Sequence, residues 1–264
     1  MMSQEDKDYI ISQLENLLGT RPVFYLKFCS QEKFTQDVCD GMLYSNTAKF
    51  FREKEIETGE RGQGDIYELV LAMQTENISV FNQETGSFLF TMPKATAKFQ
   101  FKDDDLIPIV SFVGIPLRDM ILIDANETCA TFHFPFTPDE YKHMSDRFGE
   151  HCVIIGAREL EQRIQNDCSS CGFDYIFDKV EYCCQNRIDR MQAFNTSSKQ
   201  RFLYKNEDLS YQREYRFAVG IEMPEDHYIR IGKLSNAKTL PSSELQNIAF
   251  SISYTSHRKD AEEE

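Results

Sequence analysis

Between about residues 65 and 130 the sequence runs through short segments rich in aromatic and β-branched residues, and this stretch limits the folds open to the chain. Asn, Gly, Pro and Asp separate the segments, as they separate strands in proteins. The segments that we interpret as strands are IYELVLAM, ISVFN, SFLFTM, TAKFQFK, PIVSFVGI, MILID and CATFHFPF. A chain with so many short strands must build much of its core from sheet.

Helical patterns lie on both sides of this stretch. SQEDKDYIISQLENLLG, near the N-terminus, carries an apolar stripe with Ser3 as its expected cap and a glycine at its end. TPDEYKHMSDRFG predicts a second helix, in which Thr137 caps, Pro138 takes the first helical position and Glu140 completes a capping box. Helices combined with runs of strands predict the α+β class.

The expected architecture is a single domain over residues 1–257, with a bent mixed or antiparallel sheet and peripheral helices. A β-rich insertion is expected at about residues 65–130. The last residues, 258–264, are expected to form a flexible acidic tail.

The charge of the chain restricts its partners. Its 264 residues carry a formal net charge of -14, which repels phosphate backbones and argues against general nucleic-acid binding. Apolar runs such as IPIVSFVGIPL are shorter than a membrane span, and the N-terminus shows no charged-then-apolar leader. We therefore expect a cytoplasmic protein without a membrane partner.

Eight cysteines are scattered among apolar segments, and we expect them to be reduced thiols. Cys168 and Cys171 form a C-x-x-C pair that, with Cys183 and Cys184, could hold zinc through four thiolates. Adjacent cysteines on a strand point to opposite faces, however, so that buried or idle thiols are favoured and no metal is expected.

The segment LSYQREYRFAVGIEM, from Leu209 to Met223, is typical of a strand with alternating faces. A two-residue period places Glu214 and Arg216 on the same face. Either Glu214 makes a cross-strand ion pair on a solvated face, or its carboxylate has a function. Arg213 and Arg216 would keep it ionised, because nearby cations lower the pKa of a carboxyl group.

A glycine-rich stretch, ETGERGQGD, surrounds Arg61. It leads from a helix into a strand, so it lacks the order of the dinucleotide and P-loop fingerprints. A mobile surface loop is the expected structure, with Arg61 as a phosphate contact if the loop borders a pocket.

Three segments taken in order resemble a widespread and mostly uncharacterised bacterial family. They are FYLKFCS (24–30), GMLYSNTAKFF (41–51) and SYQREYRFAV (210–219). That family begins with a Tyr-rich strand and a short helix, continues with a Leu-x-Leu-Ser-Asn strand, and ends with a Glu-x-Glu-aromatic-Arg strand. DRFGEHCVIIGARELEQRI and FDKVEYC resemble its middle, and FLYKNEDLSYQREYRFAV resembles its lysine-then-glutamate-arginine ending.

The same layout is similar to that of ADP-ribosyltransferase toxins, including the DNA-modifying ones. The resemblance implies an ADP-ribosyltransferase-like fold with NAD as a substrate. In those enzymes a late-strand Glu stabilises the positive charge that builds on the ribose as nicotinamide leaves. Carried over to this chain, the roles are catalysis by Glu214, nicotinamide support by Tyr44 and Ser45, and phosphate or ribose contacts by Lys27, Arg61 and Arg216. Lys27 stands where those enzymes carry His or Arg, and AKFFRE lacks the Asn-Asp turn of the bacterial family.

Two functions therefore stay open. The chain is either an NAD-using ADP-ribosyltransferase-like protein of toxin, phage or defence type, with a nucleotide or NAD-type molecule as its partner, or a non-catalytic acidic interaction protein. The second would be a phage inhibitor or immunity-type partner, whose charge suits a basic protein. The enzyme needs a cleft beside Glu214 that Ser45 and Lys27 face, whereas the binding protein does not.

Overall fold

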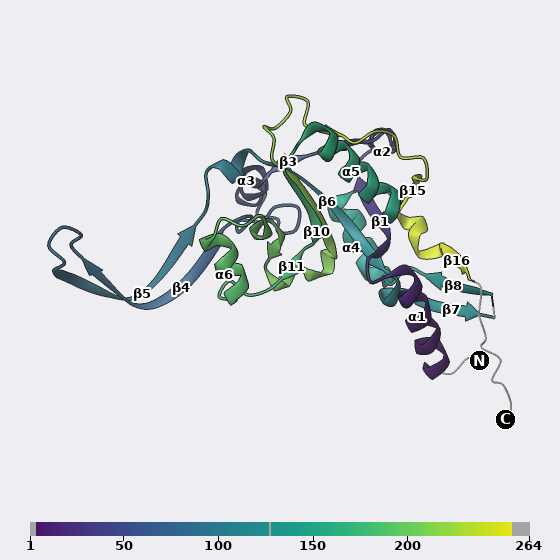
Figure 1. Ribbon diagram of the computed structural model, residues 1–264, viewed down its shortest axis with the longest axis horizontal. Coiled ribbons are helices and arrows are strands. Elements are labelled where there is room, and N and C mark those ends of the chain that lie inside the picture. The colour runs from purple at the N-terminus through teal and green to yellow at the C-terminus, as the bar shows by residue number, and fades with distance from the viewer. Residues whose placement is uncertain (1–3, 127, 255–264) are drawn as a thin grey trace. The chain divides into compact units, whose positions relative to one another are not determined.

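The structure is a computed structural model that describes residues 4–126 and 128–254 (Figure 1). The chain divides into two compact units, each assembled from separate segments. Unit 1 comprises Met1–Gly41, Val113–Arg163 and Lys233–Glu264, and unit 2 comprises Met42–Phe112 and Ile164–Gly232. The α+β class is confirmed, because helices accompany several antiparallel sheets. The single domain over 1–257 stays a prediction, and Ser3 and the 258–264 tail lie outside the described residues.

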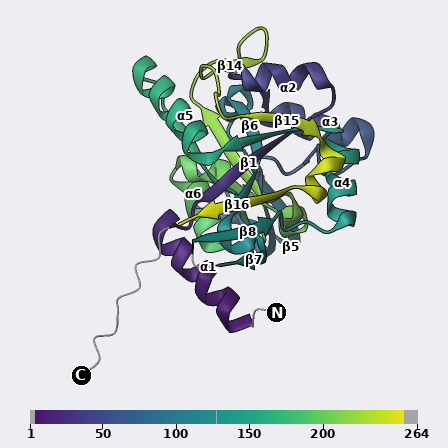
Figure 2. The same ribbon diagram turned by 90° about the vertical axis from the view of Figure 1, so that its right-hand side faces the viewer.

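Unit 1 contains two antiparallel sheets. Its helices are α1 (Gln4–Leu18), α2 (Glu32–Cys39), α4 (Pro138–Phe148) and the first part of α5 (Ala157–Cys171). Its strands are β1 (Pro22–Cys29), β7 (Ile121–Ala125), β8 (Cys129–His133), β9 (His151–Gly156), β15 (Lys238–Pro241), β16 (Ala249–Ser253) and the second part of β6 (Pro108–Pro116). The strand order is β15-β9-β1-β6 in one sheet. It is β16-β8-β7 in the other, and Figure 2 shows these three strands side by side.

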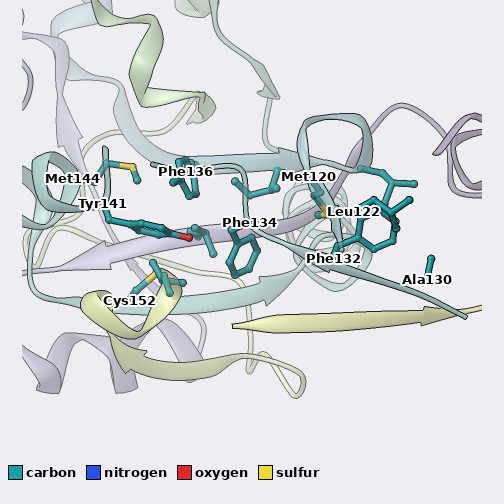
Figure 3. Packing of buried hydrophobic residues seen from close by; sticks show 14 of the residues in the cluster. Met120, Leu122, Ala130, Phe132, Phe134, Phe136, Tyr141, Met144 and Cys152 are labelled. Carbon is teal, nitrogen blue, oxygen red and sulfur yellow. The ribbon is translucent and has the colours of Figure 1, made fainter. Parts of the chain in front are cut away.

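The core of unit 1 is apolar and rich in aromatic residues. Phe132, Phe134, Phe136 and Tyr141 lie in one buried cluster with aliphatic and sulfur-containing side chains (Figure 3). The predicted helix from residue 137 is confirmed as α4, and its capping box forms as expected. The Thr137 hydroxyl accepts a hydrogen bond from the Glu140 amide, and the Glu140 carboxylate accepts one from the Thr137 amide.

Unit 2 contains three small sheets and part of a larger one. Its helices are α3 (Ala48–Thr58), α6 (Ile188–Asn195) and the last part of α5, with the 3-10 helices η1 (Asp103–Leu106), η3 (Lys199–Leu203) and η4 (Glu207–Gln212). Its strands are β2 (Met42–Tyr44), β3 (Asn46–Thr47), β4 (Leu71–Phe81), β5 (Phe88–Phe99), β10 (Tyr175–Lys179), β11 (Glu181–Tyr182), β12 (Tyr204–Lys205), β13 (Glu214–Val219), β14 (Tyr228–Arg230) and the first part of β6. Strand β13 lies between β10 and β6, β11 pairs with β12, and β2 pairs with β14.

Four of the strands predicted within residues 65–130 are in fact two long ones. ISVFN joins the end of IYELVLAM in β4, and SFLFTM joins TAKFQFK in β5, so that the two strands form an antiparallel hairpin, here called the ribbon. Asn77 has a φ of 57° within β4, and the register places Pro93 of β5 opposite it. A two-stranded ribbon tolerates both residues, because neither strand has a second neighbour to bond. Figure 1 shows the ribbon extending beyond α6 and the other elements of unit 2.

The predicted strand Leu209–Met223 is shorter than expected. Residues 207–212 form the 3-10 helix η4, and Arg213 takes a left-handed conformation with a φ of 46°. Strand β13 therefore begins at Glu214 itself. The alternation predicted from Leu209 onward therefore applies only from Glu214, after the turn at Arg213.

Candidate functional site

Glu214 is buried in unit 2, so the predicted ion pair on a solvated face is wrong. The exposed fraction is 3 % for Glu214 and 1 % for Arg216, which follows it on the same face of β13. All six residues of β13 are buried, because both faces of the strand are covered. Charge on this strand therefore needs partners inside the protein.

Both carboxylate oxygens of Glu214 are bonded to cationic or hydroxyl groups. The Ser111 hydroxyl donates to Oε1 at 2.5 Å and Arg216 Nε donates to the same oxygen at 2.9 Å. Lys205 Nζ lies 2.6 Å from Oε2. The backbone N–H of Glu214 donates to the Tyr182 hydroxyl oxygen at 2.9 Å, which fixes the start of the strand.

Arg216 connects Glu214 to a second buried carboxylate. Its two terminal nitrogens donate to Glu68 at 2.6 Å and 3.1 Å, and one of them also donates to the Phe202 carbonyl at 2.7 Å. Lys205 lies 3.8 Å from Glu68. Glu68, Lys205, Glu214 and Arg216, which we call the ionic cluster, balance two negative charges with two positive ones.

The charge environment keeps Glu214 ionised. Burial by itself raises the pKa of this carboxyl group, but Arg216 and then Lys205 outweigh burial and hold the pKa at about 2. Burial also raises the pKa of the neighbouring Asp65, and Glu68 raises it further. The surroundings therefore lower the pKa of Glu214 and raise that of Asp65.

The glycine-rich loop touches the ionic cluster through Gln212. Lys205 donates to the Gln212 side-chain oxygen at 3.0 Å, and the Gln212 amide donates to the Gly62 carbonyl at 2.8 Å. The neighbouring Arg61 forms an ion pair with Asp208 at 2.7 Å. The structure thus brings the Arg61 loop next to Glu214 and Arg216, as a site formed by these residues requires.

The other predicted contacts have different partners. The Ser45 hydroxyl is buried and donates to the His227 carbonyl at 2.9 Å, while the half-exposed Tyr44 stacks on the His227 ring with the centroids 5.6 Å apart. Both residues thus hold the segment that leads into β14. Lys27 lies on β1 in unit 1, opposite Val153 of β9. The roles assigned to these residues by resemblance stay predictions.

Sequence reasoning missed the partners that Glu214 acquires. Glu68 and Ser111 lie far from Glu214 in the sequence, and no motif marked either of them. Lys205 is the lysine of FLYKNEDLSYQREYRFAV, the segment that resembles a lysine-then-glutamate-arginine ending. The spacing of that motif was the signal that could have placed Lys205 beside Glu214.

A second site candidate, which the sequence did not indicate, is an apolar cleft in unit 2. It has a volume of about 730 Å³ and lies between α6, the base of the ribbon and the residues that follow β5. Its lining is mostly apolar and includes Met73, Phe99, Phe101, Ile188, Met191 and Phe194. Clefts of this size and polarity are typical of sites for small molecules.

The outer half of the ribbon is a third feature that could bind a partner. Phe81, Phe88, Leu89 and Phe90 are each about half exposed, with exposed fractions of 51–56 %. The register places Val80 opposite Phe90 and Ile78 opposite Met92. Ile78, Val80, Phe90 and Met92 therefore lie on one face of the ribbon. Apolar side chains gathered in this way on a surface mark contact sites.

The cysteines do not assemble into a metal site within the described residues. All eight are free; Cys168 is buried on α5, whereas Cys171 on the same helix is exposed. Across 4–126 and 128–254, no group of three or more His, Cys, Asp or Glu side chains is placed to hold a metal ion. In the same residues, no helix has the length and apolar character of a membrane span.

Comparison of the chain with protein-family models, with curated proteins and with solved structures found no match.

Proposed function

We propose that this chain is a non-catalytic binding protein, and that the outer half of the ribbon contacts an apolar surface of a partner protein. The observation that carries the proposal is an apolar face of the two-stranded hairpin, on which the half-exposed Phe90 lies with Ile78, Val80 and Met92. Such a hairpin is marginally stable in water by itself, and its apolar face gains stability from a surface that covers it. A non-catalytic interaction protein is one of the two functions that the sequence analysis left open, and this proposal adds a specific contact surface to it.

The charge distribution supports the same proposal. The ribbon, residues 71–99, carries two Glu and two Lys, whereas the whole chain carries a net charge of -14. Depletion of charge together with enrichment of aromatic residues is the composition of an interface core. A neutral ribbon can approach another protein without the repulsion that the rest of an acidic chain would cause.

The edges of the ribbon favour binding through its face. Pro93 has no N–H to donate, and Asn77 opposite it interrupts the regular backbone of β4 with its positive φ. Both features hinder the addition of another strand. The partner is therefore expected to pack against side chains such as Phe90 and Val80, not to extend the sheet.

Photo-crosslinking in the producing cell tests this proposal. A photoreactive amino acid at Phe90 is expected to yield a discrete covalent adduct, because this side chain would face the partner. The matched control is Thr91, the next residue on β5, whose side chain points to the opposite face. Adducts of equal yield from both positions, or none from Phe90, would contradict the proposal.

The second candidate is the NAD-using ADP-ribosyltransferase. It is favoured by the ionised state of Glu214, since a stabilising carboxylate must be charged at neutral pH. Catalysis would require Lys205 and Ser111 to release this carboxylate, because they now occupy it together with Arg216. Incubation of the purified protein with NAD labelled in both halves, with and without cell lysate, tests it. Absence of both nicotinamide release and label transfer would end this proposal and leave the binding proposal unaffected.

A further inference from the structure

We propose that Cys168 and Cys171, in the last turn of α5, are a modification site at which a low-molecular-weight disulfide such as glutathione disulfide converts the two thiols into an intramolecular disulfide. This inference goes beyond the proposed function, because it concerns a covalent change at the end of a helix. It uses no residue of the ribbon, which would contact the partner protein.

The two cysteines lie one helical turn apart and share a cavity. Both line a cavity of about 220 Å³ in unit 2, which leaves room for their sulfur atoms to approach each other. A separation of three residues in an α-helix places the Cα atoms about 5 Å apart. Disulfides usually join Cα atoms about 4.4–6.8 Å apart, so Cys168 and Cys171 are within reach of one bond.

The bond requires a deformation of the helix end. Neighbouring side chains on a helix have their Cβ atoms about 5–6 Å apart, and a disulfide needs about 3.5–4.5 Å. Cys171 is the last residue of α5, and Gly172 after it is left-handed with a φ of 68°. The Phe173 amide donates to the Cys168 carbonyl at 2.9 Å, as in a Schellman helix end. A last turn deforms more easily than a helix interior, but the disulfide stays strained and is therefore readily reduced.

The two thiols differ in exposure, and this difference sets the order in which they react. Cys171 is exposed, whereas the exposed fraction of Cys168 is 1 %. Burial, followed by the charges of Asp167 and Cys171, raises the pKa of Cys168 to about 11. Cys168 is therefore protonated at neutral pH and reacts slowly with a dissolved oxidant, so Cys171 reacts first.

Two thiol–disulfide exchange steps give the product. Cys171 loses its proton to water, its Sγ attacks one sulfur of glutathione disulfide, and a glutathione thiolate leaves as the S–S bond breaks. Cys168 then loses its proton, its Sγ attacks Sγ of Cys171, and the second glutathione thiolate leaves. The two cysteines together lose two electrons and two protons. Glutathione disulfide takes up both and becomes two molecules of reduced glutathione.

Peptide mapping measures the bond directly. Trypsin cleaves after Arg163 and Lys179, so the peptide 164–179 holds both cysteines. The folded protein is incubated with glutathione disulfide at neutral pH, and the remaining thiols are then alkylated in denaturant. The peptide should be two hydrogen atoms lighter than its reduced form and carry no alkyl group. Reduced glutathione, added to the oxidised protein, should restore both thiols, because the bond is strained.

Two variants separate the roles of the thiols. In Cys168→Ala, glutathione should stay on Cys171 at a level about tenfold above that in the parent, because no neighbouring thiol displaces it. In Cys171→Ser, Cys168 should stay unmodified, because it is buried. Thermal unfolding reports whether Cys168→Ala is folded, and Cys171→Ser changes only an exposed side chain.

Cys183 and Cys184 are the matched control within the chain. They also combine a buried thiol with an exposed one, and the tryptic peptide 180–187 holds both. The Cα atoms of adjacent residues lie about 3.8 Å apart, which is below the range that disulfides usually join. Glutathione should therefore remain on Cys184 under conditions in which the peptide 164–179 has released it.

Four results would overturn the proposal. The first is an unmodified Cys171 under conditions that modify Cys184. The second is an equal level of glutathione on Cys171 in the parent and in folded Cys168→Ala. The third is an equal yield of disulfide within the peptides 164–179 and 180–187, and the fourth is a disulfide that reduced glutathione does not reverse. None of them bears on the photo-crosslinking outcome, so failure here and failure of the proposed function are distinguishable.

Discussion

The two units differ in what they bury beside apolar side chains. Unit 1 packs Phe132, Phe134 and their neighbours into an apolar cluster, whereas unit 2, besides an apolar cluster that includes Leu69 and Phe202, buries the ionic cluster around Glu214 and Arg216. An apolar core tolerates changes that preserve volume, because its contacts are non-directional. An ionic cluster requires all its members, because a buried charge without its partner costs several kcal/mol. Burial alone therefore does not determine how a region of this protein responds to substitution.

The largest effect is expected from removal of Arg216. Arg216→Met preserves much of the side-chain volume but leaves both Glu214 and Glu68 without their shared guanidinium. We expect a loss of about 3–5 kcal/mol in the free energy of unfolding. Urea unfolding measures the total, and hydrogen exchange at β13 and β9 should show that the larger loss of protection lies in β13.

Arg230→Met is the control for this prediction. Arg230 pairs with Asp226 in the same unit, but both side chains are exposed. Its replacement should leave the unfolding transition and the exchange of β13 unchanged. An equal loss in the two variants would show that the ionic cluster contributes no more than a surface pair.

The next largest effect is expected when the pH is lowered. Acid should destabilise the ionic cluster of unit 2 and should leave the apolar core of unit 1 unaffected. The pKa of Glu214 falls from the ordinary 4.5 to about 2 on folding, so its contribution is complete above about pH 4.5 and is lost as the pH falls through about 2. This shift corresponds to about 3 kcal/mol. Asp65 has the opposite effect on stability. Burial raises its pKa, so its protonation at low pH stabilises the folded state relative to the unfolded one.

Unfolding in urea between pH 6 and pH 2 measures this dependence, with hydrogen exchange again separating the units. Protection of β13 should fall over this range by more than that of β9. Glu214→Gln should be less stable at pH 6 and should respond less steeply to acid, because it has no carboxyl group to protonate. If the free energy of unfolding of Glu214→Gln fell with pH as steeply as that of the parent, the acid sensitivity would come from other groups.

The sequence was sufficient to predict local elements whose signals lie within a few residues of one another. The capping box of Thr137 and Glu140 requires only its own helix, and it formed as predicted. The ribbon was harder, because Asn77 and Pro93 are strand breakers in a central strand and are tolerated where a strand has one neighbour. Whether a strand lies at the edge or in the centre of a sheet is decided by the assembled sheet, and the sequence of a single strand does not encode it.

The candidate site was predictable only in part for the same reason. Alternation correctly placed Glu214 and Arg216 on one face, but it could not indicate that this face is covered. Glu68 comes from the segment after α3 and Ser111 from β6, and their contacts with β13 exist only after folding. Likewise the apolar cleft depends on α6 lying beside the base of the ribbon, a tertiary arrangement that leaves no local pattern.

A smaller effect is expected in the core of unit 1. Ile115 is fully buried there, and Ile115→Val removes one methylene without creating an unpaired polar group. We expect a loss of about 0.5–1.5 kcal/mol in the free energy of unfolding, measured in urea at pH 7. The loss should be the same at pH 7 and pH 4, because no titrating group is involved. A strongly pH-dependent loss would show that this core is coupled to buried charge after all.

The smallest effect on stability is expected from the exposed ribbon, although its apolar side chains resemble those of the unit 1 core. Phe90→Ser removes an aromatic ring that pairs with Val80 on the surface, so the free energy of unfolding should fall by only about 0.2–1 kcal/mol. The same substitution should abolish the adduct formed from a photoreactive group at Met92, which lies on the same face, if the outer ribbon contacts a partner. Thr91→Ser, on the opposite face, should change neither quantity. A loss of several kcal/mol in Phe90→Ser would mean that the ring stabilises the fold itself, and the case for the ribbon as a contact surface would then lose its main support.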